Sequence, residues 1–179
     1  MPIMTTTSLA SLSGQLRQLN DRQAVADLIT RLGLMLDDKS FDDARTILAD
    51  DVTVQTPGGS SRGPEAVVAQ ARRSHTVRTQ HVITNMLITL EGDRAQARAN
   101  LIVTFVPDSD DPEASLTIGN SDQPQSRLMI GEHYRFQAAR GEPGWRLTSI
   151  KVARAWSTQP LAAGARVAET NRRAAPDAS

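Results

Sequence analysis

Imidazole and carboxylate side chains are the groups in this sequence best suited to chemistry. The 179-residue chain has three histidines, His75, His81 and His133, and no cysteine, so it has no thiol nucleophile, disulfide or thiolate metal site. No HExxH motif or other ligand pair accompanies the histidines, and we expect no metal site. The chemistry that remains open to the imidazole and carboxylate groups is proton transfer. An imidazole can remove a proton beside a carbonyl or a leaving group when a carboxylate fixes its tautomer.

Two residues have suitable types and places for this chemistry. Asp37 ends the predicted first helix, one turn after Gly33, whose lack of a side chain leaves room beside the carboxylate. His81 begins a long predicted strand. Each residue also has a purely structural alternative. An aspartate at a helix end, here beside Asp38, is commonly solvated or capping, and a single strand histidine is commonly a satisfied core or rim residue.

Three further polar residues have weaker indications of a role. His75 follows Arg72 and Arg73 at a predicted helix end, where it would complement the helix dipole. His133 and Tyr134 are neighbours in a predicted strand, so they point to opposite faces and at most one of them reaches a pocket. His133 would supply a second acid/base group or a substrate hydrogen bond if it faces inward. Otherwise it is a polar surface residue.

The composition excludes several classes of partner. Twenty Lys and Arg residues balance twenty Asp and Glu residues, so the chain lacks the basic surplus of a nucleic-acid-binding protein. Its three Phe, two Trp and one Tyr residues are too few for a base-stacking platform. No apolar run has membrane-spanning length and the N-terminal stretch lacks a secretory signal. We therefore expect a cytoplasmic protein that binds neither nucleic acid nor membrane.

Hydrophobic periodicity predicts one α+β domain over residues 14–160, between a flexible arm at 1–13 and a frayed tail at 161–179. Helical spacing comes first and long alternating strands follow, so helices are expected on one face of a sheet. The acidic stretch at 107–124 would be a lid, a partner contact or disordered chain. The predicted helices span 15–36 (with Asp21 as a cap), 41–48 and 64–73, and the predicted strands span 52–56, 76–90, 94–106, 127–139 and 145–156.

Six sequence words in this order resemble the SnoaL-like branch of the nuclear-transport-factor-2-like superfamily. The words are DRQAVADLITRLGLMLD, FDDARTILADDV, GPEAV, QHVITN, GDRAQARA and GWRL. They lie between Asp21 and Leu147, and the resemblance covers roughly residues 20–157. The resemblance implies a cone-shaped α+β barrel, in which N-terminal helices pack in a curved, mostly antiparallel sheet with a pocket at the open end. It also implies a homodimer through the sheet.

The resemblance also implies a function. In dehydratase and dehydrochlorinase members, an aspartate at the position of Asp37 orients a histidine at the position of His81. We therefore expect a cofactor-independent enzyme that dehydrates, isomerises or cyclises a small apolar substrate by Asp-His acid/base chemistry. The main alternative is a non-catalytic small-molecule-binding or accessory module, because Leu32 stands where related dehydratases have a tyrosine, and the region of Phe105 lacks their further polar group. A structural subunit is a third possibility.

The remaining predicted pocket residues come from strand spacing. Arg98 and Asn100 match part of the Asp-Arg-Asp set of epoxide-hydrolase members, but an amide is a poor general base, so that chemistry is disfavoured. Asn85 is placed on the same strand face as His81, for a hydrogen bond within the sheet or to substrate. Arg154 and Trp156 share a face and would edge the pocket. The predicted substrate-binding set is Leu32, Met35, Asn85, Arg98, Asn100, Met129, His133 and Trp156.

Overall fold

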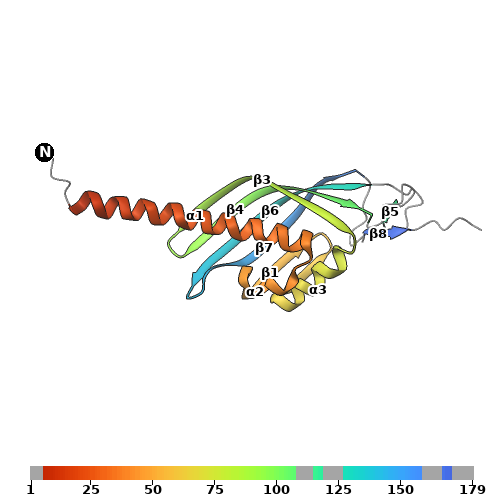
Figure 1. The fold of residues 1–179 in the computed structure, drawn as a ribbon, viewed down its shortest axis with the longest axis horizontal. Helices are drawn as coiled ribbons and strands as arrows, with labels where there is room; N and C mark the ends of the chain where they lie inside the picture. The colour runs from red at the N-terminus through yellow and green to blue at the C-terminus, as the bar shows by residue number, and fades with distance from the viewer. Residues whose placement is uncertain (1–5, 108–114, 119–126, 159–166, 171–179) are drawn as a thin grey trace, which may run out of the picture.

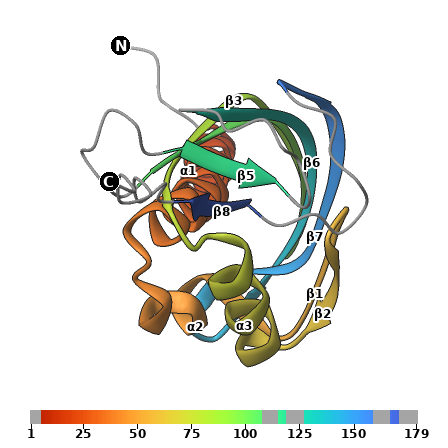
Figure 2. The ribbon, with the colours of Figure 1, turned by 90° about the vertical axis from the view of Figure 1, so that its right-hand side faces the viewer.

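Six strands form one curved sheet, and the helices lie inside its curve (Figures 1 and 2). The structure, a computed structural model, describes residues 6–107, 115–118, 127–158 and 167–170. The strand order is β2-β1-β7-β6-β4-β3. Among the described strands β2 and β3 are the two edges, so the sheet does not close on itself. The predicted cone-shaped α+β fold is confirmed.

Helix α1 (Thr6–Asp38) provides the main surface against which the sheet packs. Its core face carries Val25, Leu28, Ile29 and Met35, each at most 2% exposed. The prediction that the helix begins at residue 15 is wrong, because α1 begins nine residues earlier and its first turns project beyond the sheet (Figure 1). The predicted flexible arm at 1–13 is likewise wrong for residues 6–13, whose leucines continue the helical spacing of the residues that follow, although these turns bury no apolar face against the domain. No helix in the described ranges is both long and apolar enough to cross a bilayer.

The segment after α1 builds one edge of the sheet. A 3-10 turn η1 (Phe41–Asp43) and helix α2 (Ala44–Ile47) lead into β1 (Leu48–Thr56). The predicted order of helix and strand is confirmed, but the strand begins four residues before the predicted start at 52. Strand β2 (Gly59–Arg62) then pairs with β1 where the sequence predicted a loop. Helix α3 (Pro64–Ser74) begins at its proline, which lacks the N–H that a first helical turn leaves unpaired, and it packs on β1.

Four long strands form the predicted antiparallel meander. They are β3 (Arg78–Glu91), β4 (Arg94–Val106), β6 (Leu128–Gly141) and β7 (Gly144–Ser157). Antiparallel pairs join β3 to β4, β4 to β6 and β6 to β7. Strand β1 adds to β7 in parallel, which makes the sheet mixed. Through this parallel pair, β1 and its neighbour β2 extend the sheet beyond the four strands of the meander.

A second, two-stranded sheet lies at the end of the curved sheet where β3 begins (Figure 2). Strand β5 (Ser115–Ile118) pairs antiparallel with β8 (Val167–Thr170). The predictions of an irregular excursion and a frayed tail are therefore wrong for these two strands. Local sequence patterns missed them because the pair joins segments far apart in the chain. The rest of both segments, and residues 1–5 of the predicted arm, fall outside the described residues.

Candidate active site

Asp37 and His81 form a hydrogen-bonded pair between the last turn of α1 and the start of β3. The Nδ1 atom of His81 lies 2.5 Å from Asp37 Oδ1, and the backbone N–H of His81 donates to Oδ2 at 2.8 Å. The Thr79 hydroxyl donates to Oδ1 at 2.9 Å. The His81 side chain is 3% exposed and that of Asp37 is 18% exposed. Both carboxylate oxygens therefore hold the strand and the imidazole in place.

Gly33 allows this pair to form. A Cβ atom at Gly33 would lie 3.2 Å from Ile83 Cδ1 and 3.7 Å from the Cβ of His81. The first of these separations is tighter than ordinary van der Waals contact, so a larger residue would push α1 away from β3. Asp37 lies one turn further along the same helix. The glycine therefore sets the separation between α1 and β3 across which the Asp37 carboxylate reaches His81.

The Asp37 carboxylate is ionised at neutral pH. Burial opposes its ionisation, but hydrogen bonds from the His81 side chain, the His81 backbone and Thr79, together with the charge of His81, hold its pKa below the ordinary value of 3.8. A carboxylate only accepts hydrogen bonds, so the Nδ1 atom of His81 carries a hydrogen. The Nε2 atom is then the one available for proton transfer.

His75 lies directly against that second nitrogen. Its Nε2 atom is 3.3 Å from His81 Nε2, and its Nδ1 atom is 3.0 Å from the carbonyl oxygen of Ala71. Burial first, and the positive charge of His81 second, lower the pKa of His75 from 6.5 to about 4. The predicted helix-dipole role is therefore wrong, because a histidine that is neutral at pH 7 supplies no charge to the helix end.

A cavity of about 180 Å³ opens beside the two histidines. Its wall is mostly aliphatic and takes residues from α1, α3 and the strands. Leu32 and Met35, both in the predicted set, are part of this wall. Such a cavity suits a small, mostly apolar molecule held by a few polar groups. Other apolar lining residues are Val54, Val67, Val103, Phe105, Ile130, Ile150 and Val152.

Glu132 and Tyr134 bring a second polar group into the cavity from β6, together with Arg154 from β7. The Tyr134 hydroxyl donates to the Glu132 carboxylate. Burial raises the pKa of Glu132, and the charges of Arg154 and His81 oppose that rise. Burial, followed by the charge of Glu132, holds the pKa of Tyr134 well above its ordinary value of 10. The tyrosine therefore stays protonated and acts as a hydrogen-bond donor.

The sequence interpretation sought the further polar group near Phe105 and did not single out Glu132. The structure places Phe105 in the apolar wall and supplies the polar groups from the neighbouring strand. Tyr134 provides a hydroxyl in the cavity that Leu32 also lines. The available signal was strand alternation, because Glu132 and Tyr134 are two residues apart and share a face. The alternation argument for His133 and Tyr134 holds: Tyr134 lines the cavity and His133 is exposed.

The placement of Asn85 on the same face as His81 is wrong. The register of β3 with β4 shifts between Thr84 and Leu87, and Asn85 adopts a left-handed conformation with φ 52°. This bulge interrupts the alternation, so Asn85 is exposed and the next residue, Met86, packs against the core. Asparagine is among the residues that tolerate this conformation best.

The other predicted substrate contacts also lie away from the cavity lining. Arg98 and Asn100 are exposed because they alternate with the buried alanines of β4. Met129 lies between buried Leu128 and Ile130 and is absent from the cavity wall. Trp156 is 45% exposed and covers Gly131, so Arg154 alone of the predicted edge pair reaches the cavity.

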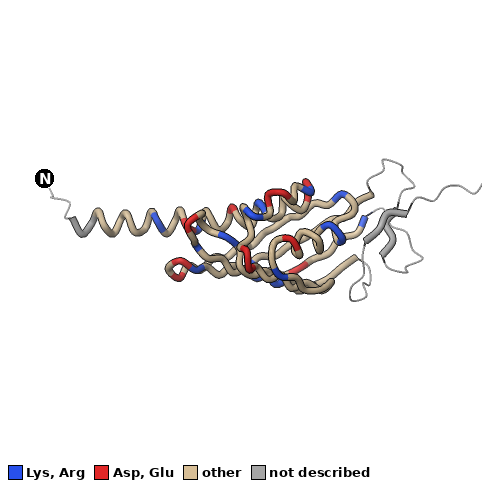
Figure 3. The backbone as a smooth tube through the Cα atoms, turned by 90° about the horizontal axis from the view of Figure 1, so that it is seen from below, with Lys and Arg blue, Asp and Glu red and all other residues tan. Residues whose placement is uncertain are grey.

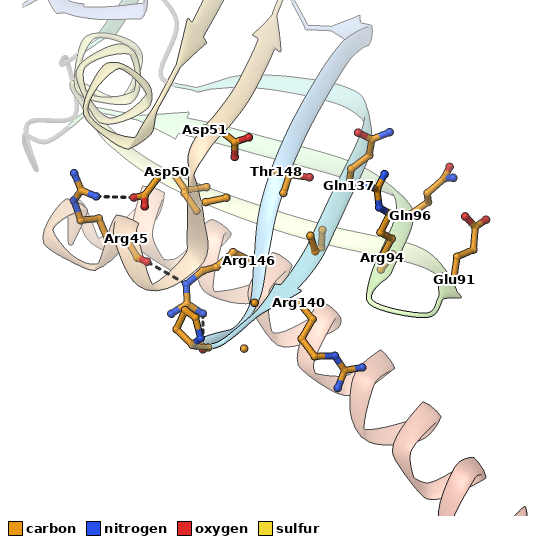
Figure 4. Close-up of a pocket in the computed structure, with 18 residues that line it drawn as sticks. Arg45, Asp50, Asp51, Glu91, Arg94, Gln96, Gln137, Arg140, Arg146 and Thr148 are labelled. Carbon is orange, nitrogen blue, oxygen red and sulfur yellow. Dashed lines mark hydrogen bonds and ion pairs between the residues drawn. The ribbon is translucent and has the colours of Figure 1, made fainter.

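A wider groove, of about 840 Å³, lies near the β3–β4 and β6–β7 turns (Figure 4). Three arginines that line it, Arg45, Arg140 and Arg146, have partners within the protein. Arg45 pairs with Asp50 and Glu65, and Arg146 donates to backbone carbonyls. Within the described ranges, no cluster of three or more His, Asp or Glu side chains could hold a metal ion. The small cavity is thus the better candidate for chemistry.

The fold is that of a SnoaL-like protein. Residues 17–151 match the SnoaL-like domain family, and the chain belongs to that family. None of the curated protein sequences compared with the chain matches it. The resemblance seen in the sequence words is confirmed.

Solved structures share the architecture. The Kfla4162 protein from Kribbella flavida is 24% identical, with a TM-score of 0.66 over 78% of this chain and 94% of that one. An NTF2-like protein with a cystatin-like fold from Novosphingobium aromaticivorans is 21% identical, with a TM-score of 0.63 over 86% and 92%. A type 2 hexachlorocyclohexane dehydrochlorinase (LinA) is 19% identical, with a TM-score of 0.67 over 83% and 93%. At these identities the likeness establishes the fold.

Proposed function

We propose that this protein is a cofactor-independent enzyme that moves a proton on a small, mostly apolar organic substrate, with His81 as the general base. The observation that carries the proposal is the hydrogen-bonded Asp37–His81 pair, whose buried histidine lines an aliphatic cavity. Asp37 fixes the tautomer and stabilises the imidazolium that forms. The dehydrochlorinase likeness supports proton abstraction as the first step.

The second polar group favours dehydration within the reactions that this base could start. His81 Nε2 takes a proton from the carbon next to a carbonyl, and the electron pair left on that carbon expels a hydroxyl group from its neighbour. A hydroxyl leaves as water when it receives a proton, and the acid that we assign is protonated Glu132, whose pKa burial raises and whose carboxyl group the Tyr134 hydroxyl orients. Return of the proton from His81 to Glu132, through solvent, completes the cycle. Isomerisation and cyclisation, including polyketide cyclisation, use the same base with a different fate for the carbanion.

The test is hydrogen–deuterium exchange at the acidic carbon of a panel of neutral β-hydroxy carbonyl compounds, followed by proton NMR in D2O. This readout reports proton abstraction whichever reaction follows it. We expect wild-type protein to accelerate exchange, and we expect H81N to lower the rate at least about 100-fold. The matched control is H133N, which changes an exposed histidine outside the cavity and keeps the wild-type rate. Equal exchange by H81N and wild type would remove His81 as the base.

A second candidate is a small-molecule-binding module. It is favoured by the contact between His75 and His81, because His75 Nε2 occupies the position next to the nitrogen that a substrate would need. In this case wild-type protein binds panel compounds in the cavity and gives no exchange above buffer. Calorimetric titration beside the exchange assay separates the two functions.

Two expectations accompany the proposed enzyme. A homodimer through the outer face of the sheet is supported by exposed Val82, Leu87 and Ile102 on that surface. A cytoplasmic location is supported by the cysteine-free composition. Sedimentation and cell fractionation, respectively, test these two predictions.

A further inference from the structure

The projecting part of α1 carries a row of leucines that the domain does not cover. Leu9, Leu12, Leu16 and Leu19 are 54%, 48%, 53% and 61% exposed. Their spacing of three, four and three residues places them within an arc of about 80° on the helix, at 3.6 residues per turn. We call these four side chains the leucine stripe. Figure 1 shows this end of α1 extending beyond the sheet.

The leucine stripe faces away from the protein's own core. Val25, Leu28 and Leu32, which the sheet buries, lie on the opposite side of the same helix. The side of α1 nearest the domain in this region carries Gly14 and Arg17, which line a shallow groove with the β3–β4 turn. The stripe therefore cannot be buried by the sheet of its own chain, so a second molecule is needed to cover it.

The spacing identifies a helix as the covering element. Apolar residues at alternating steps of three and four make the narrow seam by which two helices pack together. The helix is already formed, because its second half is anchored in the core, so pairing carries no cost of helix nucleation.

The charges argue for a second copy of this chain rather than a lipid surface. Arg17 is the one charged residue between Thr6 and Asn20, and the described part of the projecting end of α1 is mostly tan in Figure 3. Helices that lie on membranes carry several basic residues beside the apolar face. The flanks of the leucine stripe are uncharged at Ser13, Gln15 and Asn20, so two copies meet without like charges opposite one another.

We propose that two copies of this protein associate by antiparallel pairing of their leucine stripes. The spacing reads the same in both directions, so Leu9 lies opposite Leu19 of the other copy and Leu12 lies opposite Leu16. In a parallel pair the contact would continue along the same face of α1 to Gln23 and Asp27. Within each chain the Gln23 amide donates to the Asp27 carboxylate at 2.7 Å. The parallel arrangement would bring the two Asp27 carboxylates together at the seam. Antiparallel pairing keeps them apart and leaves the two domains at opposite ends.

Sedimentation velocity on the full chain tests the surface. We expect wild-type protein to have at least twice the mass of L12E/L16E: a monomer carries one stripe and pairs to a dimer, whereas a pair joined through the sheet carries two stripes and assembles to four or more chains. The matched control is S11E/Q18E, which places the same charges on the opposite side of the same helix and keeps the wild-type mass. Circular dichroism and melting temperature, equal in the two variants, show that the domain is folded. Equal masses for wild type and L12E/L16E would overturn the proposal.

Spin labels test the direction of pairing, because the chain has no native cysteine to block. In the antiparallel pair the two-fold axis lies near residue 14, and each residue adds 1.5 Å along the helix axis. Labels at Q15C in the two copies are therefore expected about 3 Å apart along that axis, and labels at Q23C about 27 Å apart. A parallel pair gives the same separation at both sites. Equal distances would therefore overturn the antiparallel arrangement.

Discussion

The Nε2 atoms of His75 and His81 lie 3.3 Å apart, and a proton has to sit between them for the contact to be a hydrogen bond. His75 already uses its Nδ1 hydrogen on the Ala71 carbonyl and is neutral near pH 7, so its Nε2 atom is an acceptor. The hydrogen of such a bond would come from His81, whose other nitrogen faces Asp37. For His81 to accept a proton from a substrate, its Nε2 atom has to be free of that hydrogen, and the two nitrogens have to separate.

The first prediction concerns His75 and stability in acid. The pKa of His75 is about 4 in the folded protein and 6.5 when exposed, so the unfolded chain takes up the proton first as the pH falls. The free energy of unfolding should therefore drop by about 3 kcal/mol between pH 6.5 and 4 from this group. Urea titrations across that range should show a shallower decline for H75Q than for wild type. The exposed-site control H133Q should keep the wild-type slope; a wild-type slope for H75Q would contradict the assignment.

The second prediction concerns the charge of Asp37. D37N keeps the shape of the side chain but removes the charge that stabilises the imidazolium, so deuterium exchange into substrate should fall at least about 100-fold. The neighbouring D38N changes an exposed carboxylate and should leave the rate unchanged. The Asp37 pKa is lowered in the folded state, so its contribution to stability is present above about pH 4 and is lost as the pH falls below that value. In D37N, the free energy of unfolding should lack the portion of its decrease below about pH 4 that comes from protonation of Asp37.

The third prediction concerns the Tyr134–Glu132 hydrogen bond. Y134F removes a donor from the carboxylate, so the pKa of Glu132 should rise further and the free energy of unfolding should change by about 1 kcal/mol. The limb of the pH–rate profile that belongs to Glu132 should move to higher pH. In protein that already carries E132Q, adding Y134F should not shift the pH–rate profile. A double-mutant cycle with independent effects would show that the two side chains do not act together.

The fourth prediction concerns the close approach at Gly33. G33V places methyl groups against Ile83 and His81, which should lower the free energy of unfolding by about 1–3 kcal/mol. It should also weaken exchange activity, because the last turn of α1 moves and carries Asp37 with it. Shortening the neighbour in G33V/I83A should recover part of both losses. Full activity in G33V alone would mean that the close approach does not position Asp37.

The order of elements was predictable because each long element has one buried face. The core face of α1 and the alternation of β4 give strong periodic signals. Asp21 shows the limit of that reasoning. Predicted as a helix cap, it lies in the middle of α1, where its carboxylate accepts hydrogen bonds from Arg140 and Trp145. Its partners come from the far end of the chain, and local sequence cannot reveal them.

The site was predictable in part for a similar reason. Asp37 and His81 were singled out through the family resemblance, and the structure brings them into contact. Their catalytic role stays a prediction. The bulge at Asn85 could not be anticipated, because one inserted residue reverses every later side chain in the strand. The predicted helix-dipole role of His75 does not hold, because burial lowers the pKa of this histidine and local sequence does not specify burial.

The parallel pairing of β1 with β7 also has a consequence for folding kinetics. It places Val54 beside Ile150, and both residues line the cavity. The meander can form by successive hairpins, whereas β1 has to wait for the last strand of the same sheet to be synthesised and positioned. Contacts of such long sequence separation form slowly. Closure of this cavity wall is therefore expected to be a late event in folding, so a ligand that fits the cavity should bind only after the rest of the sheet is in place.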